Sequence, residues 1–306
     1  MCTAIFDKEN RLFGRTLDLE YSYNEAVTVT PRGFYFPLRA QKPFVCRYAI
    51  IGISTVENGY PLYYDAVNEK GLAMAGLNFP KSAHYFEAKR GALNLAPFEI
   101  IPYILGQCET LDEAMKHFEK MNVCNVSFSE KFTSSPLHWL IADKTRCAVI
   151  ESVQDGLKIY PNGTGVMTNE PPFPYHVTRL EDFAGLSAKE KGGGGPRGMA
   201  AYGLPGDFSS SSRFVRAAFL LKNSVTEGSA ASQFFKILDN VSVPRGAIVL
   251  DDGKTVITHY AACMDMEKGV YYYKTYSNSR ICAVRLHEKE ADSLISYPLK
   301  KDEDIN

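Results

Sequence analysis

The cysteine at position 2 combines, more than any other residue of this chain, the groups that could do chemistry. A small side chain at that position permits removal of Met1, which would leave a thiol and a free α-amine on one residue. An α-amine titrates close to neutral pH and can act as a general base toward an adjacent nucleophile. The pattern favours a hydrolase whose nucleophile and base are both on Cys2. A single cysteine is nevertheless a weak motif, and an ordinary residue of an edge strand is the alternative interpretation.

Arg15 and Asp18 strengthen the first interpretation because they follow Cys2 by one predicted hairpin. An alternating apolar run, a polar turn at 7–10 and a second apolar run predict two strands that return Arg15 and Asp18 alongside Cys2. A guanidinium beside the thiol would favour the thiolate. A carboxylate beside the α-amine would orient it and stabilise its protonated form. An exposed Arg–Asp ion pair, which contributes little, is the alternative.

Short strands and pairs of helices alternate along the rest of the chain. Residue patterns of period two predict antiparallel strands over 48–55, 62–67, 71–77, 137–142, 147–153, 157–160, 255–262, 269–276 and 281–286. Helical patterns follow at 97–105, after the capping box 110–113, at 212–222 with Ser212 as its N-cap, and at 229–238. This order predicts an α+β fold of two antiparallel sheets with helix pairs on their outer faces. No linker or strong internal repeat divides the chain, so residues 1–306 are predicted to form one domain.

Composition and missing motifs exclude several classes of function. Lys and Arg total 34 and Asp and Glu total 35, a balance that argues against a protein held on nucleic acid by phosphate contacts. No apolar run is long enough to span a membrane, and charged residues from position 7 do not suit a secretory signal, so a cytoplasmic protein is expected. The seven cysteines include no C-x-x-C pair, and the six histidines show no ligand spacing, so no metal is predicted. The glycines at 192–195 lack the context of a phosphate loop and predict a flexible surface loop.

Taken in order, several short stretches carry a resemblance that covers essentially the whole chain. They are 1–3, 13–15 with Asp18, 30–33, 68–72, 75–80, 137–139, 167–171, 204–207 and 212–216. Each is weak alone, but together the sequence resembles the choloylglycine hydrolase family of N-terminal-nucleophile amidases. That family contains bile salt hydrolases and penicillin V acylases. The resemblance implies the four-layer αββα sandwich of N-terminal-nucleophile hydrolases, and a homotetramer.

The resemblance also assigns roles to individual residues. Cys2 would attack the amide carbonyl and carry the acyl group as a thioester, and its own α-amine would act as base and then as acid. Arg15 would lie beside the thiolate and Asp18 would hold the amine. Asn78 and Asn169 would contribute to the oxyanion hole, through backbone or side chain, and Arg213 would support the charges around the site. No cofactor or metal is implied.

The substrate expectation comes from the same resemblance. In the family, asparagine at the position of Asn78 accompanies the bile-salt branch, whereas penicillin V acylases often carry tyrosine there. Glycine- or taurine-conjugated bile salts are therefore the expected substrates, which implies a gut bacterium as the source. Leu17 and Phe128 match positions that line the pocket, whereas the 55–60 loop departs from relatives by carrying Glu57 and Asn58.

Four alternatives to a bile salt hydrolase stay open. Two of them would use the same catalytic residues, and two would not. A penicillin V acylase or an N-acyl homoserine lactone amidase would differ only in pocket shape. A non-catalytic relative would keep Met1 and have no reactive thiol. An acid amidase of the lysosomal kind would begin with a secretory signal and contain an internal self-cleavage site.

Overall fold

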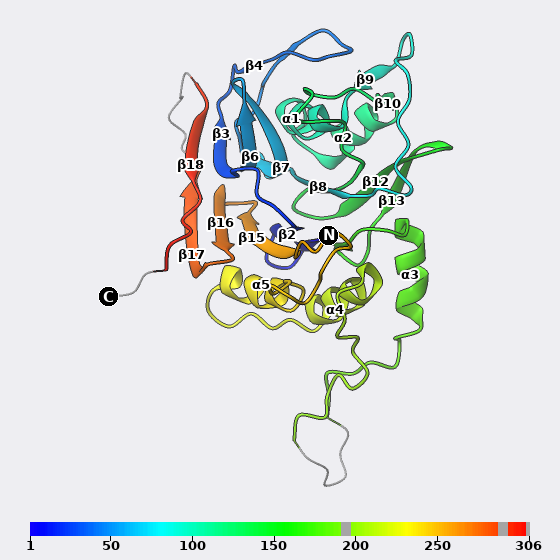
Figure 1. Ribbon diagram of the computed structural model, residues 1–306, viewed down its shortest axis with the longest axis vertical. Coiled ribbons are helices and arrows are strands. Elements are labelled where there is room, and N and C mark those ends of the chain that lie inside the picture. The colour runs from blue at the N-terminus through cyan, green and yellow to red at the C-terminus, as the bar shows by residue number, and fades with distance from the viewer. Residues whose placement is uncertain (191–196, 287–292, 304–306) are drawn as a thin grey trace.

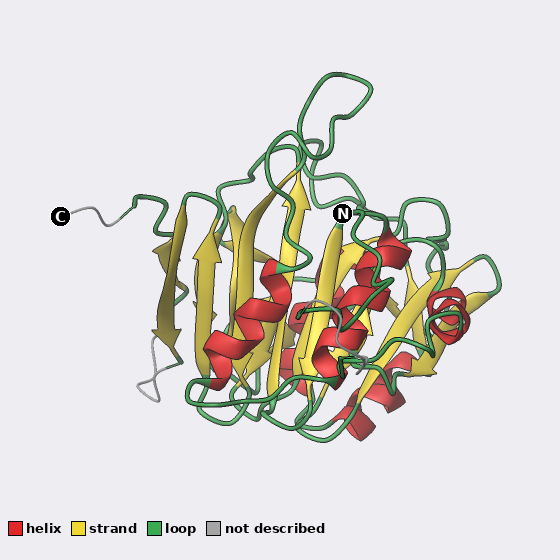
Figure 2. Cartoon of the chain, turned by 90° about the horizontal axis from the view of Figure 1, so that it is seen from below, coloured by secondary structure: helices red, strands yellow, loops and turns green. Residues whose placement is uncertain are grey.

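Two antiparallel β-sheets are stacked face to face, with helices on both outer sides (Figures 1 and 2). This arrangement is seen in a computed structural model that describes residues 1–190, 197–286 and 293–303. The predicted glycine loop at 192–195 lies outside the described residues. The four layers follow the order helix, sheet, sheet, helix, so the predicted sandwich is confirmed.

The six-stranded sheet contains the beginning of the chain. Its hairpin β1–β2 is the one predicted from the first nineteen residues, and β1 lies inside the sheet between β14 and β2. In spatial order the strands are β14 (Val166–Met167), β1 (Cys2–Asp7), β2 (Leu12–Leu19), β15 (Ile257–Asp265), β16 (Val270–Thr275) and β17 (Asn278–Arg285).

The eight-stranded sheet faces the first one across a common apolar core. In spatial order its strands are β13 (Gly156–Pro161), β12 (Cys147–Val153), β11 (Leu137–Ala142), β8 (Ala73–Asn78), β7 (Tyr60–Asn68), β6 (Ile50–Glu57), β3 (Ala26–Thr30) and β18 (Ile295–Pro298). Two short pairs lie apart from it: β4 (Tyr35–Phe36) with β5 (Phe44–Val45), and β9 (Leu93–Leu95) with β10 (Met121–Val123).

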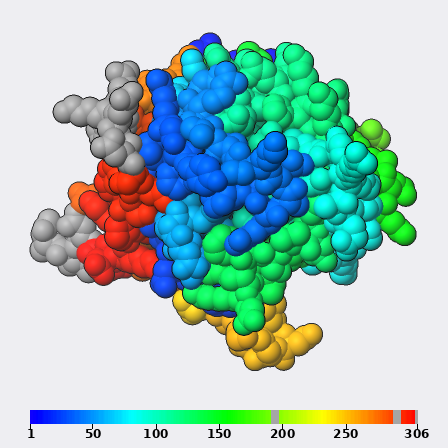
Figure 3. Space-filling view, turned by 90° about the horizontal axis from the view of Figure 1, so that it is seen from above, coloured from blue at the N-terminus to red at the C-terminus, as the bar shows by residue number. Residues whose placement is uncertain are grey.

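Helices cover the outer face of each sheet because each presents one apolar side to it. The 3₁₀ turn Pro97–Glu99, α1 (Ile100–Gln107) and α2 (Leu111–Phe118) enclose a second core on the eight-stranded sheet. The segment around β4 and β5, blue in Figure 3, covers part of this face. On the other side, α4 (Ser210–Lys222) and α5 (Ala230–Asp239) pack on the six-stranded sheet, and α3 (Phe173–Glu181) packs against α4. None of the helices in the described ranges is long and apolar enough to cross a membrane.

The helices differ from the predictions in three places. The pattern at 97–105 forms the 3₁₀ turn at 97–99 and then α1, which ends at Gln107. Helix α4 begins at Ser210 and is capped by Ser209, whose hydroxyl accepts the Ser212 N–H, so Ser212 is not the N-cap. Four consecutive serines offered the same capping chemistry, and the hydroxyl of Ser212 instead donates to Asp207. Helix α3 was not predicted, because prolines punctuate the sequence where its first turn forms.

Candidate active site

Cys2 lies at the start of β1 with its side chain in the space between the two sheets. In the β1–β2 hairpin Cys2 pairs with Leu17, and Ala4 pairs with Arg15. Paired residues project to the same face of a sheet, so Cys2, Leu17 and Arg15 share one face. That face meets the eight-stranded sheet, because Arg15 Nη1 donates to the carbonyl of Gly76 at 2.7 Å. Cys2 is only 2% exposed, so its thiol lies in a largely water-excluded position.

Arg15 is fully enclosed and acts as a fixed positive charge beside Cys2. Its Nε lies 4.0 Å from the carboxylate of Asp65, which also accepts hydrogen bonds from the hydroxyls of Tyr260 and Tyr271. Burial by itself lowers the pKa of Arg15, but the negative charges of Cys2, Tyr260 and Asp65 raise it above its usual value. The guanidinium therefore stays charged next to the thiol.

Asp18 lies on the opposite face of β2 from Arg15, toward the helix layer. Its carboxylate accepts hydrogen bonds from Thr16 Oγ1 at 3.0 Å and Thr258 Oγ1 at 2.6 Å. Burial raises the pKa of Asp18, and the positive charges of the chain's N-terminal amine and of Arg213 oppose that shift. Its backbone exchanges two hydrogen bonds with Met1, from Met1 N to Asp18 O at 2.6 Å and from Asp18 N to Met1 O at 3.0 Å. Met1 thus continues the β1–β2 pairing by one residue.

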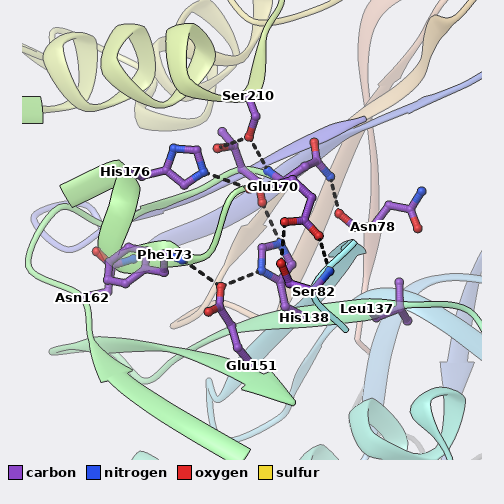
Figure 4. A network of polar contacts seen from close by, with 12 residues as sticks. Asn78, Ser82, Leu137, His138, Glu151, Asn162, Glu170, Phe173, His176 and Ser210 are labelled. Carbon is purple, nitrogen blue, oxygen red and sulfur yellow. Dashed lines mark hydrogen bonds and ion pairs between the residues drawn. The ribbon is translucent and has the colours of Figure 1, made fainter. Parts of the chain in front are cut away.

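Asn169 joins three elements at the Cys2 nitrogen. Its Oδ1 accepts hydrogen bonds from Cys2 N at 2.7 Å and from Arg213 Nη2 at 2.8 Å. Its Nδ2 donates to the carbonyl of Asn78 at 2.8 Å (Figure 4). The amide orientation is fixed, because two donors face its oxygen and an acceptor faces its nitrogen.

Arg213 is the second buried cation, reaching the site from the first turns of α4. It donates to Cys2 O at 2.5 Å, to Thr3 Oγ1 at 2.8 Å and to Phe208 O at 3.0 Å, besides its bond to Asn169. Burial lowers the pKa of Arg213, while Asp18 and Cys2 raise it. Its contacts join β1 to α4. They also offset the unfavourable interaction of a positive charge with the dipole at the start of the helix.

Comparison with known proteins then gives the family. A model of the linear amide C–N hydrolases, choloylglycine hydrolase family, matches residues 2–296. The chain belongs to the choloylglycine hydrolase family. A bile salt hydrolase/transferase of Lactiplantibacillus plantarum is 48% identical, over 99% of this chain and 98% of its own length. A crystal structure of a variant of the conjugated bile acid hydrolase from Clostridium perfringens has a TM-score of 0.92 at 32% identity, covering 100% of this chain and 99% of its own. A penicillin V acylase from Agrobacterium tumefaciens shares the fold, with a TM-score of 0.78 at 21% identity, over 98% of this chain and 92% of its own.

For this member of the choloylglycine hydrolase family, the geometry gathers most of the predicted residues. Cys2, Arg15, Asp18, Asn169 and Arg213 are joined by the hydrogen bonds and charge interactions just described, and Leu17 pairs with Cys2. Asn78 takes part through its backbone carbonyl, which accepts from Asn169.

Phe128 is the predicted residue that the structure does not bring to Cys2. It borders a cavity of about 240 Å³ whose walls also include Arg39, Tyr60 and Phe98, and not Cys2. Its ring lies edge-on to that of Phe98 and its carbonyl accepts from Arg39 Nη2 at 2.9 Å. Phe128 therefore belongs to an aromatic cluster on the helical side of the eight-stranded sheet.

Other residues of the site were missed because no local pattern marks them. The hydroxyls of Thr3, Thr16 and Thr258 serve Arg213 and Asp18, but threonines in strands are common and carry no signal of their own. His138 and His176, which contact the carbonyl oxygens of Thr168 and Asn169, carry no recognisable spacing in the sequence either. Across the described ranges, no group of three or more His, Cys, Asp or Glu side chains is placed to hold a metal ion.

Proposed function

We propose that the protein is a bile salt hydrolase, which cleaves the amide bond of glycine- or taurine-conjugated bile acids. The observation that carries the chemistry is the contact of Cys2 N with Asn169 Oδ1 at 2.7 Å, beside a buried thiol and the charged Arg15. The nitrogen that must become the base is already hydrogen-bonded at the nucleophile. Support for the bile-salt substrate comes from the 48% identical relative, which is named a bile salt hydrolase/transferase.

The first half of the reaction forms a thioester. Once Met1 is removed, the Cys2 α-amine accepts the thiol proton, and the sulfur attacks the carbonyl carbon of the substrate amide. A C–S bond forms and the carbonyl oxygen takes up the negative charge. The tetrahedral intermediate then collapses, the C–N bond breaks, and the ammonium group of Cys2 gives its proton to the departing glycine or taurine.

The second half restores the enzyme. The α-amine, again neutral, takes a proton from water while the water oxygen attacks the thioester carbon. The C–S bond breaks, the bile acid leaves as its carboxylic acid, and the proton returns to sulfur. In this scheme Arg15 stabilises the thiolate, while Asp18 offsets the positive charge on the amine.

Asn169 and Asn78 are proposed to stabilise the oxyanion. An amide nitrogen carries two hydrogens, and one of those on Asn169 Nδ2 is donated to Asn78 O. The second hydrogen is available to the developing negative charge, together with a donor of Asn78. Loss of one oxyanion donor costs about 2.7–4 kcal/mol in other enzymes, so each group would be important for the rate.

The experiment uses purified protein with its N-terminal mass measured, exposed to glycocholate, taurocholate and penicillin V. Predominant release of glycine or taurine would support the proposal, and their ratio would give the head-group preference. Predominant release of 6-aminopenicillanic acid would overturn it in favour of a penicillin V acylase. No release from any of the three, with Met1 already removed, would also overturn it.

The homotetramer, the cytoplasmic location and the gut-bacterial source are further parts of the proposal that rest on the family resemblance. Light scattering coupled to size-exclusion chromatography tests the first of them. A mass of about one chain would contradict it.

A further inference from the structure

Two buried histidines, His138 and His176, contact the backbone of residues 168–169 and have no part in the chemistry proposed above; both are labelled in Figure 4. His138 on β11 is 1% exposed and His176 on α3 is 2% exposed. His138 Nε2 lies 2.7 Å from the carbonyl oxygen of Thr168, and His176 Nε2 lies 2.9 Å from that of Asn169. A carbonyl oxygen can only accept, so each Nε2 carries a hydrogen and donates it. The carbonyl groups of two successive residues, Thr168 and Asn169, are thus each hydrogen-bonded by a histidine, one from β11 and one from α3.

Aromatic stacking fixes the direction of both donors. The His138 ring stacks on Phe79, with centroids 4.3 Å apart and planes 7° from parallel. The His176 ring stacks on Phe214, with centroids 5.0 Å apart and planes 19° from parallel. Because neither ring can turn without losing this stacking, neither donor can leave its carbonyl at little cost.

Glu151 holds the far side of the His138 ring. Its Oε1 lies 3.0 Å from His138 Nδ1 and accepts the N–H of Phe173, also at 3.0 Å. The contact joins His138 on β11 to Glu151 on β12. The pair also anchors the first residue of α3, the helix that carries His176.

His176 contributes a hydrogen bond rather than packing alone. Its Nδ1 is buried without a hydrogen-bond partner, an arrangement that costs free energy and that an apolar ring would avoid. Burial lowers the pKa of His176, and the neighbouring charge of Arg213 lowers it further, which favours the neutral ring. In the neutral ring, the hydrogen on Nε2 is the one donated to Asn169.

The residues around Asn169 are tied down on their other sides as well. Asn169 N donates to Ser210 Oγ at 2.8 Å. The carboxylate of Glu170 accepts from the backbone N–H groups of Lys81 and Ser82, each at 2.8 Å, just beyond Asn78. These hydrogen bonds hold the backbone of residues 168–170 in one conformation, and that conformation sets the position of the Asn169 side chain.

We propose that His138 and His176 are positioning residues that aim the Asn169 side chain at the Cys2 nitrogen and at Asn78. The inference rests on the proposed function only in that Asn169 must serve the amine and the oxyanion. If a donor is lost, the peptide group can rotate and the Asn169 amide leaves the Cys2 nitrogen. Both histidines are buried, so neither is open to a bound substrate, and we expect the effect on kcat rather than on KM.

Two substitutions at His176 separate positioning from packing. His176→Phe keeps the stacking and loses the donor, whereas His176→Gln keeps a donor and loses the stacking. We expect kcat to fall about 100-fold in His176→Phe, with KM little changed, and to recover in part in His176→Gln. His117→Phe on α2, remote from Cys2, is the matched control and is expected to keep wild-type kcat. A His176→Phe enzyme that is as active as wild type, or more active than His176→Gln, would overturn the proposal.

The rate of Cys2 alkylation by iodoacetamide separates this inference from the proposed substrate, because it needs only the thiol and the amine. We expect slower alkylation in His176→Phe than in wild type, even if no bile salt is hydrolysed; equal rates would count against positioning. If His176→Phe does not fold, nitrogen NMR of the histidines in the wild-type protein decides instead. A neutral His176 with its hydrogen on Nε2 is expected, and a hydrogen on Nδ1 would contradict the inference.

Discussion

The side-chain oxygen of Asn169 lies 2.7 Å from the backbone nitrogen of Cys2, although the two residues are 167 positions apart in the chain. The same oxygen accepts from Arg213 at 2.8 Å, so a buried cation polarises the amide that contacts the future amine. This relationship places the nucleophile, the proposed base and the proposed oxyanion donor on one connected network of hydrogen bonds.

Replacing the nucleophile tests its assignment most directly. Cys2→Ala should abolish turnover of any amide substrate, because no thioester can form. The side chain is small and belongs to the first residue of β1, so the melting temperature should change little. Turnover is measured by amine release and folding by circular dichroism. Residual activity near the wild-type level would exclude Cys2 as the nucleophile.

Retention of Met1 should inactivate the enzyme without disturbing its fold. Met1 pairs with the backbone of Asp18 through two hydrogen bonds, so the untrimmed chain has a place in the structure. Its Cys2 nitrogen, however, is an amide and cannot accept a proton. Protein made while methionine aminopeptidase is inhibited, and checked by mass, should release no amine. Full activity of that form would rule out the α-amine as the base.

Asn169→Asp keeps an acceptor for Cys2 and Arg213 but loses the Nδ2 donor. The donor to Asn78 and to the oxyanion disappears, and a negative charge takes its place. From the usual cost of an oxyanion donor we expect kcat/KM to fall by about 10²–10³. Asn223→Asp, an exposed change at the end of α4, is a matched control and should leave kcat/KM unchanged.

Asp65→Asn should make Cys2 more reactive toward alkylation. Burial raises the pKa of Asp65, and its carboxylate lies 4.0 Å from Arg15 Nε, where its negative charge offsets that of the guanidinium. Asparagine still accepts a hydrogen bond but carries no charge. The positive charge of Arg15 is then no longer offset, and it stabilises the Cys2 thiolate more strongly. The rate of iodoacetamide reaction at pH 6 should rise. A slower reaction would show that Asp65 acts by holding Arg15 in place.

Asp207 should make the stability of the protein sensitive to acid. Hydrogen bonds from Ser209 and Ser212 lower the pKa of Asp207 from 3.8 to about 2. A carboxyl group whose pKa is lowered by folding stabilises the folded state when the pH is above its ordinary pKa. That stabilisation is lost as the pH falls from about 4 through about 2. Since Asp207 is exposed, about 1 kcal/mol is expected after allowance for solvent screening. Denaturant unfolding of Asp207→Asn at pH 6 and pH 2.5 should show a smaller pH dependence than wild type.

The sequence predicted the parts of the site that local pattern determines. The β1–β2 hairpin places Arg15 near Cys2 because alternation and a polar turn set its register. The predicted N-cap also held, since Thr110 accepts the Glu113 N–H at the start of α2, but the Glu113 carboxylate accepts from Glu109 N and not from Thr110 N, so the capping box is incomplete. Asn169 and Arg213 were available only through the family resemblance, because their contacts with Cys2 depend on how distant elements pack.

The positions that sequence reasoning could not recover are those whose role depends on burial alone. His138 and His176 stand singly in the sequence, and nothing local shows that both donate to neighbouring carbonyls. Phe128 stays a prediction for the substrate pocket, and the structure places its ring edge-on to that of Phe98. Aromatic residues in loops fit either location, and only the packing of the loop decides between them.

The position of β1 inside its sheet has a practical consequence for producing the enzyme. Strand β1 begins at Cys2 and lies between β14 and β2. Any residues fused ahead of Met1 would therefore have to pass next to Cys2. An affinity tag at that end would also keep the Cys2 nitrogen in a peptide bond. The last strand, β18, lies at the edge of the eight-stranded sheet, away from Cys2 (Figure 1). Recombinant protein should therefore be tagged at its carboxyl end, and preparations tagged at the amino end should be inactive until the tag and Met1 are removed.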